Sequence, residues 1–126
     1  MPDQPFRPHD RIRRSADFQR AFRLRRSAGD HLLLVFGHPN GLRHPRLGLS
    51  VSRRIGGAVV RNRWKRLLRE AFRLSREELP AGLDLVVVPR RGAEPTLDGL
   101  RQSLCRLAGR VARKMQQGGD VEQGPG

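Results

Sequence analysis

Residues 58–74 read AVVRNRWKRLLREAFRL, and this stretch decides the fold. Its large apolar residues recur at intervals of three and four: Trp64, Leu67, Leu68, Ala71 and Phe72. That spacing is typical of an amphipathic helix with one buried face. The pattern therefore predicts a helix from about Ala58 to Leu74. Within it, Trp64, Leu68 and Phe72 are predicted to pack in the core rather than to stack on a ligand.

The same stretch carries a ridge of positive charge. Four cations follow one another at intervals of four residues: Arg61, Lys65, Arg69 and Arg73. Asn62 and Arg66 lie beside this ridge, and Arg63 lies away from it, nearer Glu70. Each like-charge pair at this spacing costs about 0.2–0.5 kcal/mol of helix stability. An ordinary solvated face mixes acids with bases, but Glu70 is the only acid here. We therefore interpret the ridge as an exposed phosphate-binding surface.

The residues before this helix predict two strands and a shorter helix. Leu47–Ser52 alternates large apolar residues with glycine and serine, which predicts a strand with one buried face and one small, polar face. The apolar run Leu32–Phe36 predicts another strand. Ser15 is predicted to cap a helix of about ten residues, in which Phe18 and Phe22 share one face.

The residues after the basic helix predict one more strand and one more helix. Leu83–Val88 is nearly all apolar, which indicates a central strand. Pro95 and Thr96 open a helix with an apolar stripe at Leu100, Leu104, Leu107 and Val111. Residues 1–10 are expected to form a flexible basic arm, and the Gly-rich residues 116–126 a disordered tail. Residues 11–115 are expected to form a single domain.

The charge of the whole chain points to a polyanionic partner. Its 126 residues include 26 Lys and Arg against 12 Asp and Glu, a formal net charge of +14. Lys65 and Lys114 are the only lysines. Because arginine binds phosphate through two parallel hydrogen bonds and stacks on bases, nucleic acid is the expected partner. Codon bias in a GC-rich genome is an alternative explanation for the choice of arginine over lysine, but not for the net charge.

The sequence lacks the patterns that several other classes of protein need. No apolar run approaches the roughly 18 residues of a membrane span, and no apolar segment of a secretory signal follows the N-terminal residues. Cys105 is the only cysteine, so a cytoplasmic protein is expected. A protein nuclease needs a carboxylate–metal cluster or a histidine acid–base pair, whereas the acids here are scattered and the histidines isolated. We therefore expect no catalytic and no metal-binding residues in this chain.

The central stretch also resembles a known family. Arg61–Glu70, RNRWKRLLRE, resembles the RNR signature of the bacterial ribonuclease P protein component. Leu47–Gly56 is similar to the strand and loop that precede this signature in the family, and Asp17–Phe22 is similar to the family's first helix. The resemblance covers the chain from about Arg11 to Arg113.

This resemblance implies a fold. The expected architecture is α+β: a single-domain α/β sandwich with elements in the order αβββαβα and a four-stranded sheet. The family's βαβ crossover through the basic helix is left-handed, an exception to the usual rule. One additional short strand is implied near Arg25–Ala28.

The resemblance also implies a function, in which the protein assists a catalytic RNA in removing the 5′ leader of precursor tRNA. The basic helix and its preceding loop would contact the catalytic RNA through Arg53, Arg54, Arg61, Asn62, Arg63, Lys65, Arg66 and Arg69. A cleft between the first helix and the sheet would hold the leader, lined by Phe18, Phe22, Phe36, Ser50 and Ser52. The implied partners are the ribonuclease P RNA subunit and precursor tRNA, with no protein partner required. The hydrolytic chemistry would belong to the RNA and to Mg²⁺ bound mainly by it.

Three positions depart from the family's pattern. Gly57 stands where the loop commonly has Asn, so any contact of that amide is lost. Phe36 stands where Tyr is common, which removes a hydroxyl but keeps a surface for stacking. Pro89 is expected to end the last strand. Phe18 and Phe22 also have a simpler interpretation as core residues, and two other classes of protein remain open: a ribosomal or ribosome-assembly protein, and a nuclease that needs no RNA subunit.

Overall fold

The computed structural model describes residues 6–24 and 26–118, and for residues 21–24 and 117–118 it describes the backbone alone. The main elements follow in the order α1 (Ser15–Leu24), β1 (Ser27–Gly29), β2 (Leu33–Pro39), β3 (Arg46–Leu49), α2 (Ala58–Ser75), β4 (Leu83–Pro89) and α3 (Leu97–Gly118). Short 3₁₀ turns precede α1, precede α2 and follow α2: η1 (Pro8–Asp10), η2 (Arg53–Ile55) and η3 (Arg76–Glu78). This order, αβββαβα, is the one that the family resemblance implied.

The four strands form one mixed sheet in the spatial order β1-β2-β4-β3. β2 is antiparallel to β1 and β4, whereas β3 is parallel to β4. A parallel pair needs a long crossover connection, and α2 supplies it between β3 and β4. The short strand β1, which only the resemblance predicted, pairs with β2 along Ser27–Gly29.

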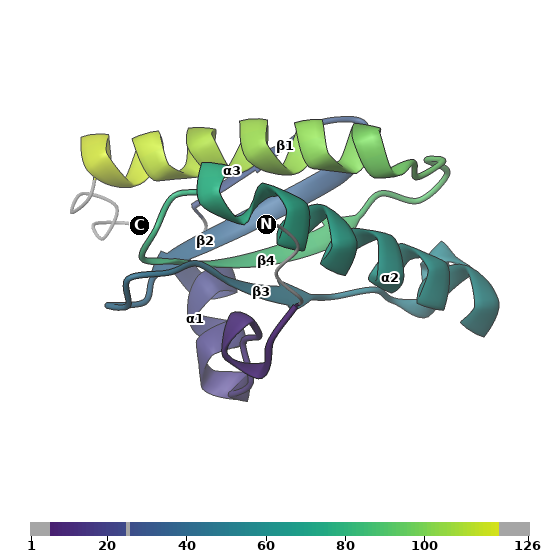
Figure 1. Cartoon of the computed structure of the whole chain (residues 1–126), viewed down its shortest axis with the longest axis horizontal. Coiled ribbons are helices and arrows are strands. Elements are labelled where there is room, and N and C mark those ends of the chain that lie inside the picture. The colour runs from purple at the N-terminus through teal and green to yellow at the C-terminus, as the bar shows by residue number, and fades with distance from the viewer. Residues whose placement is uncertain (1–5, 25, 119–126) are drawn as a thin grey trace.

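The helices lie on both sides of this sheet. Figure 1 shows α3 along one side of the sheet, α2 beside α3, and α1 on the opposite side. The main core lies between the sheet and the pair α2 and α3. Trp64 is 2% exposed and Leu68 and Phe72 are fully buried there, which confirms the apolar face predicted for α2.

A smaller apolar cluster lies under α1 on the other face. Ile12 and Val86 are its buried members, and Phe18 and Phe36 pack against them. The strand register places Phe36, Val86 and Gly48 side by side across β2, β4 and β3. The predicted alternation of β3 is therefore confirmed, because Leu47 and Leu49 belong to the main core while Gly48 faces α1.

Two strands end elsewhere than predicted. β3 ends at Leu49 rather than at Ser52, whose hydroxyl instead accepts a hydrogen bond from the Arg54 N–H (3.3 Å) at the start of η2. β2 continues past Phe36 to Pro39, because His38 and Pro39 still pair with β4. Phe36 thus lies in the middle of its strand. β4 ends at Pro89, as expected.

The N-terminal segment, expected to form a flexible basic arm over residues 1–10, makes several contacts with the domain in its described part, whereas residues 1–5 lie outside the described residues. The Phe6 ring meets the Phe72 ring edge-on, with centroids 5.7 Å apart. Asp10 is 1% exposed and accepts a hydrogen bond from Arg76 (2.6 Å). Beyond it, the Ile12 N–H donates to the Leu47 carbonyl (3.0 Å), so the segment covers part of the outer edge of β3. Local sequence could not reveal these contacts because their partners lie far along the chain.

The C-terminal boundary also differs from the expectation. α3 continues through Gly118, so the first residues of the predicted tail are helical. The rest of that tail, residues 119–126, lies outside the described residues.

Candidate nucleic-acid interface

The loop before α2 is built to present its cations to solvent. Ser52 caps η2, and Gly56 ends it with φ of 154°, a conformation that residues with side chains rarely adopt. Arg53 and Arg54 are exposed on this turn. The Arg61 Nε donates to the Gly56 carbonyl (3.1 Å), so the first turn of α2 fixes the loop.

The cations of α2 divide into two sets by exposure. Asn62, Arg63 and Arg66 are exposed. The ridge residues Arg61, Lys65 and Arg69 were predicted to be exposed, but they are half-buried. The reason is that the ridge borders the buried stripe of α2, so its side chains lie along neighbouring parts of the chain before they reach solvent.

Most of this surface has no carboxylate to neutralise it. Glu70 accepts hydrogen bonds from Arg73, which lower the pKa of Glu70, so this carboxylate pairs with Arg73. Arg63 instead pairs with Glu94 (3.2 Å), and both side chains are more than half exposed. Among the residues that the structure describes, no carboxylate pairs with the remaining cations of the surface: Arg53, Arg54, Arg61, Lys65, Arg66 and Arg69.

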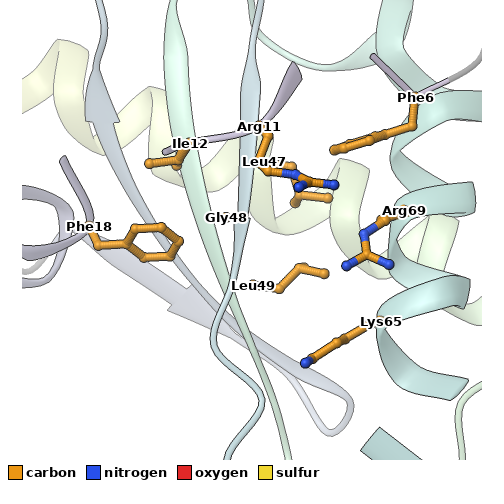
Figure 2. A pocket seen from close by; sticks show the side chains of 9 residues that line it. All are labelled: Phe6, Arg11, Ile12, Phe18, Leu47, Gly48, Leu49, Lys65 and Arg69. Carbon is orange, nitrogen blue, oxygen red and sulfur yellow. The ribbon is translucent and has the colours of Figure 1, made fainter. Parts of the chain in front are cut away.

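Two of the half-buried ridge residues reach into a groove of about 190 Å³ beside β3. Figure 2 shows Lys65 and Arg69 extending from α2 toward it, with Phe18 on the other side of the strand. The full lining is Phe6, Arg11, Ile12, Phe18, Leu47, Gly48, Leu49, Lys65 and Arg69. The groove therefore connects the cationic surface of α2 with Phe18, one of the residues predicted to line the aromatic cleft. The sequence alone had indicated these as two separate surfaces.

The structure brings together some of the residues predicted to line the aromatic cleft. Phe18 and Phe36 are both half-buried and share the small cluster on the α1 face of the sheet. Phe22 lies in α1, but its side chain is outside the described part of the chain. On the same face the next row of the sheet, Leu34 and Val88, is also only half-buried. The half-buried rings and this row form an apolar surface that can accept stacked bases.

The two serines predicted for the cleft have different positions. Ser50 is half-buried, and its N–H donates to the Val87 carbonyl (3.0 Å), which continues the edge of the sheet. Ser52 is exposed at the loop, where its hydroxyl caps η2. Ser52 thus sits with Arg53 and Arg54 rather than between Phe18 and Phe36.

An ionic network that the sequence analysis missed holds α1 on the sheet. The Arg46 guanidinium makes two hydrogen bonds to Asp84 (2.7 and 2.6 Å) and one to Asp17 of α1 (3.3 Å). The Asn40 amide donates to the same Asp84 carboxylate (3.0 Å). Asp84 is 1% exposed, and a buried carboxylate must be paired. The lone acid in the apolar run Leu83–Val88 was the signal that could have predicted this network.

Two observations concern other kinds of site. Within the described residues, no three side chains of His, Cys, Asp or Glu gather closely enough to hold a metal ion. None of the helices in that part of the chain is both long enough and apolar enough to cross a membrane.

Comparison with known proteins gives a consistent result. The sequence model of the family described as Ribonuclease P matches residues 6–112. The ribonuclease P protein component of Brevibacillus brevis is 40% identical over 103 residues, which cover 80% of this chain and 82% of that protein. The corresponding protein of Desulfovibrio desulfuricans is 46% identical over 111 residues, which cover 83% of this chain and 85% of that protein.

Solved structures agree with the sequence comparison. The RNase P protein of Thermotoga maritima superposes with a TM-score of 0.70 at 33% identity, covering 76% of this chain and 92% of that one. The RNase P protein of Staphylococcus aureus also gives a TM-score of 0.70 at 33% identity, covering 82% of this chain and 95% of that one. The similarity thus extends over nearly the whole length of both solved proteins.

Proposed function

The chain belongs to the ribonuclease P protein family, and we infer that it is the RNA-binding protein component of ribonuclease P, the enzyme that matures the 5′ end of tRNA. The observation that carries this inference is the cationic surface of α2 and its preceding loop, which has the family's RNR sequence and in which six cations have no carboxylate partner within the described part of the chain. A surface of this kind attracts polyanions, and RNA phosphates are polyanions of the matching charge.

We propose that this surface binds the catalytic RNA. Exposed Arg63 and Arg66 on α2, with Arg53 and Arg54 on η2, are available to phosphates without any movement of the backbone. Their guanidinium groups bind phosphate oxygens through two parallel hydrogen bonds, which fixes orientation as well as charge. Asn62 adds a neutral side chain that can donate to a phosphate or a ribose.

We propose that the α1 face of the sheet receives the 5′ leader of precursor tRNA. Phe18 and Phe36 offer ring surfaces, and Leu34 and Val88 extend the same half-buried face. A base stacked on an aromatic side chain gains about 1–3 kcal/mol, with little dependence on its identity. This sequence tolerance suits a subunit that has to accept the leaders of many different tRNAs.

The hydrolytic step is assigned to the RNA subunit. The residues that we assign to RNA binding include no carboxylate, the side chain through which proteins usually bind Mg²⁺. We therefore propose that Mg²⁺ is held mainly by the RNA, and that this chain binds substrate and reduces phosphate repulsion in the complex. On this proposal the protein works in the cytoplasm beside its tRNA substrates and needs no protein partner.

The binding surface can be tested by its salt dependence. Replacing Arg61, Lys65 and Arg69 together by Ala should weaken binding to ribonuclease P RNA and flatten the log–log salt dependence by roughly 0.7–0.9 per lost phosphate contact. The matched control removes three exposed cations from α3 instead, namely Arg110, Arg113 and Lys114. A slope that is unchanged in the α2 variant, or flattened equally in the control, would contradict the assignment of this surface.

A further inference from the structure

The groove beside β3 brings three cations from two separate segments to one place. Lys65 and Arg69 come from α2, and Arg11 comes from the N-terminal segment, which the family-based site did not include. Figure 2 shows all three long side chains gathered on the α2 side of β3. Among the residues that the structure describes, none of those lining the groove is acidic. Three cations so close together repel one another unless an anion lies between them.

The edge of β3 also offers peptide groups to this groove. Peptide groups of successive residues in a strand point alternately to its two sides. The Leu47 carbonyl points outward and accepts the Ile12 N–H (3.0 Å), whereas the Ser50 N–H points inward to Val87 (3.0 Å). By this alternation the N–H and C=O of Leu49 point outward, beyond the part of the edge that the N-terminal segment covers. An exposed strand edge of this kind is a ready donor and acceptor for a ligand.

The position of Arg11 is fixed by contacts that reach into the core. Its guanidinium lies 5.8 Å from the centroid of the Phe6 ring, a cation–π contact. Phe6 in turn packs edge-on against the buried ring of Phe72. The Asp10–Arg76 pair (2.6 Å) holds the adjoining turn against the end of α2. Arg11 is thus preorganised, so a ligand that it binds does not have to order a flexible arm.

We propose that this groove binds the backbone of single-stranded RNA, with one phosphate held by Arg11, Lys65 and Arg69. The neighbouring nucleotide would hydrogen-bond to the outward peptide groups of Leu49. A groove of about 190 Å³ is about the size of one nucleotide, and the peptide groups of β3 beside it are accessible to a nucleotide whose base is unpaired. The proposal rests on the function proposed above, and it gives the N-terminal segment a direct role in RNA binding.

The test compares Arg11→Ala with Arg13→Ala, two charge deletions in the same segment. Arg13 is exposed and does not line the groove, so it is a matched control. Binding is measured at several salt concentrations in two arms. The first arm uses ribonuclease P RNA alone, and the second uses precursor and mature tRNA with the reconstituted holoenzyme. The arm that responds tells whether the bound strand belongs to the catalytic RNA or to the leader. Thermal melts confirm that both variants are folded.

We expect Arg11→Ala to weaken binding roughly 10- to 100-fold in one arm, the range of a lost charge-assisted hydrogen bond, and to flatten the salt slope there by about 0.7. The affinity of Arg13→Ala for either RNA should stay within about twofold of that of the unchanged protein, since this substitution removes only long-range attraction. Equal effects of the two variants in both arms would overturn the groove proposal while leaving the proposed function intact. Unchanged protein that bound neither RNA would instead contradict the proposed function itself.

Discussion

The ring of Phe18 lies directly on the backbone of Gly48: a β-carbon placed on that glycine would come within 2.6 Å of the Phe18 Cζ atom. The side chain of Ile12 closes the same position at 3.1 Å. Only a residue without a side chain lets α1 approach β3 this closely. The depth of the aromatic cleft therefore depends on Gly48 as much as on Phe18.

Gly48→Ala is expected to lower the free energy of unfolding by about 1–3 kcal/mol, because the added methyl group has to displace a packed ring. Chemical denaturation of the variant measures this loss. The second variant, Gly48→Ala with Phe18→Leu, restores space beside the methyl group and should recover part of the loss. If the double variant is as unstable as the sum of the two single ones, the Phe18–Gly48 contact is not the cause.

Phe18→Ala is expected to separate substrate binding from folding. Loss of one stacked base should weaken holoenzyme binding to precursor tRNA by roughly 5- to 150-fold, whereas mature tRNA lacks the leader and should bind as before. Affinities for both tRNAs, measured after the variant is shown to be folded, test this. If both affinities fall by the same factor, or neither changes, Phe18 is a core residue and other residues line the leader site.

Trp64→Ala is expected to cost about 3–5 kcal/mol of unfolding free energy, because the indole is 2% exposed in the main core. The measurement is the midpoint of denaturant unfolding, with Val59→Ala as control, since Val59 is 83% exposed on the same helix. A Trp64→Ala variant of unchanged stability that no longer binds RNA would show that the helix faces the other way.

Asp30 connects the β1–β2 turn to α3. Its carboxylate accepts hydrogen bonds from the Leu32 and Leu33 N–H groups (2.9 Å each) and from the buried Ser103 hydroxyl (2.7 Å). Burial alone would raise the pKa of Asp30, but these bonds and the one from Arg106 outweigh it and lower the pKa to about 2. The folded state thus favours the charged form of this group.

Asp30→Asn is therefore expected to lower the unfolding free energy at neutral pH by roughly 1–3 kcal/mol, since an amide cannot accept all of these bonds. A lowered pKa in the folded state means that the stabilisation is complete above the ordinary value of 3.8 and is lost as the pH falls through about 2. The unfolding free energies of the unchanged protein and of Asp30→Asn, measured between about pH 6 and pH 2, should differ less and less as the pH falls. The exposed Glu77→Gln is the control, and a difference that does not vary with pH would rule out the carboxylate as its source.

Parts of the fold with strong local periodicity could be predicted from sequence. α2 and its buried face followed from the spacing of Trp64, Leu68 and Phe72, and the two faces of β3 followed from its alternation. β1 could not be predicted in this way, because Ser27–Gly29 is a short edge strand without large apolar residues. The end of β2 could not be predicted either, because His38-Pro39-Asn40-Gly41 has the composition of a turn, whereas in the structure His38 and Pro39 still pair with β4.

Site residues that lie on one helix could be predicted from their spacing in the sequence. Site residues that come together from distant parts of the chain could not. The cations of α2 share one helix, so their spacing was enough to assemble them. Arg11 joins them through contacts between residues far apart in the chain, among them the Asp10–Arg76 pair and the packing of Phe6 on Phe72. The same holds for Arg46 and Asp17, which fix α1 over the sheet. Non-local ion pairs leave no periodic trace in a sequence. Asp84, as the lone acid in an apolar run, indicated that a partner was needed, but the tertiary structure was required to identify that partner.

The most direct test of the central claim is cleavage of precursor tRNA at low Mg²⁺ by three samples: the protein alone, ribonuclease P RNA alone, and the two together. We expect no cleavage by the protein alone, slow cleavage by the RNA alone, and a clear acceleration by the mixture, because the protein supplies substrate contacts and screens phosphate repulsion. The variant with Ala at Arg61, Lys65 and Arg69 should accelerate the reaction less. Cleavage by the protein in the absence of RNA, or an RNA-catalysed rate that the protein leaves unchanged, would contradict the proposed function.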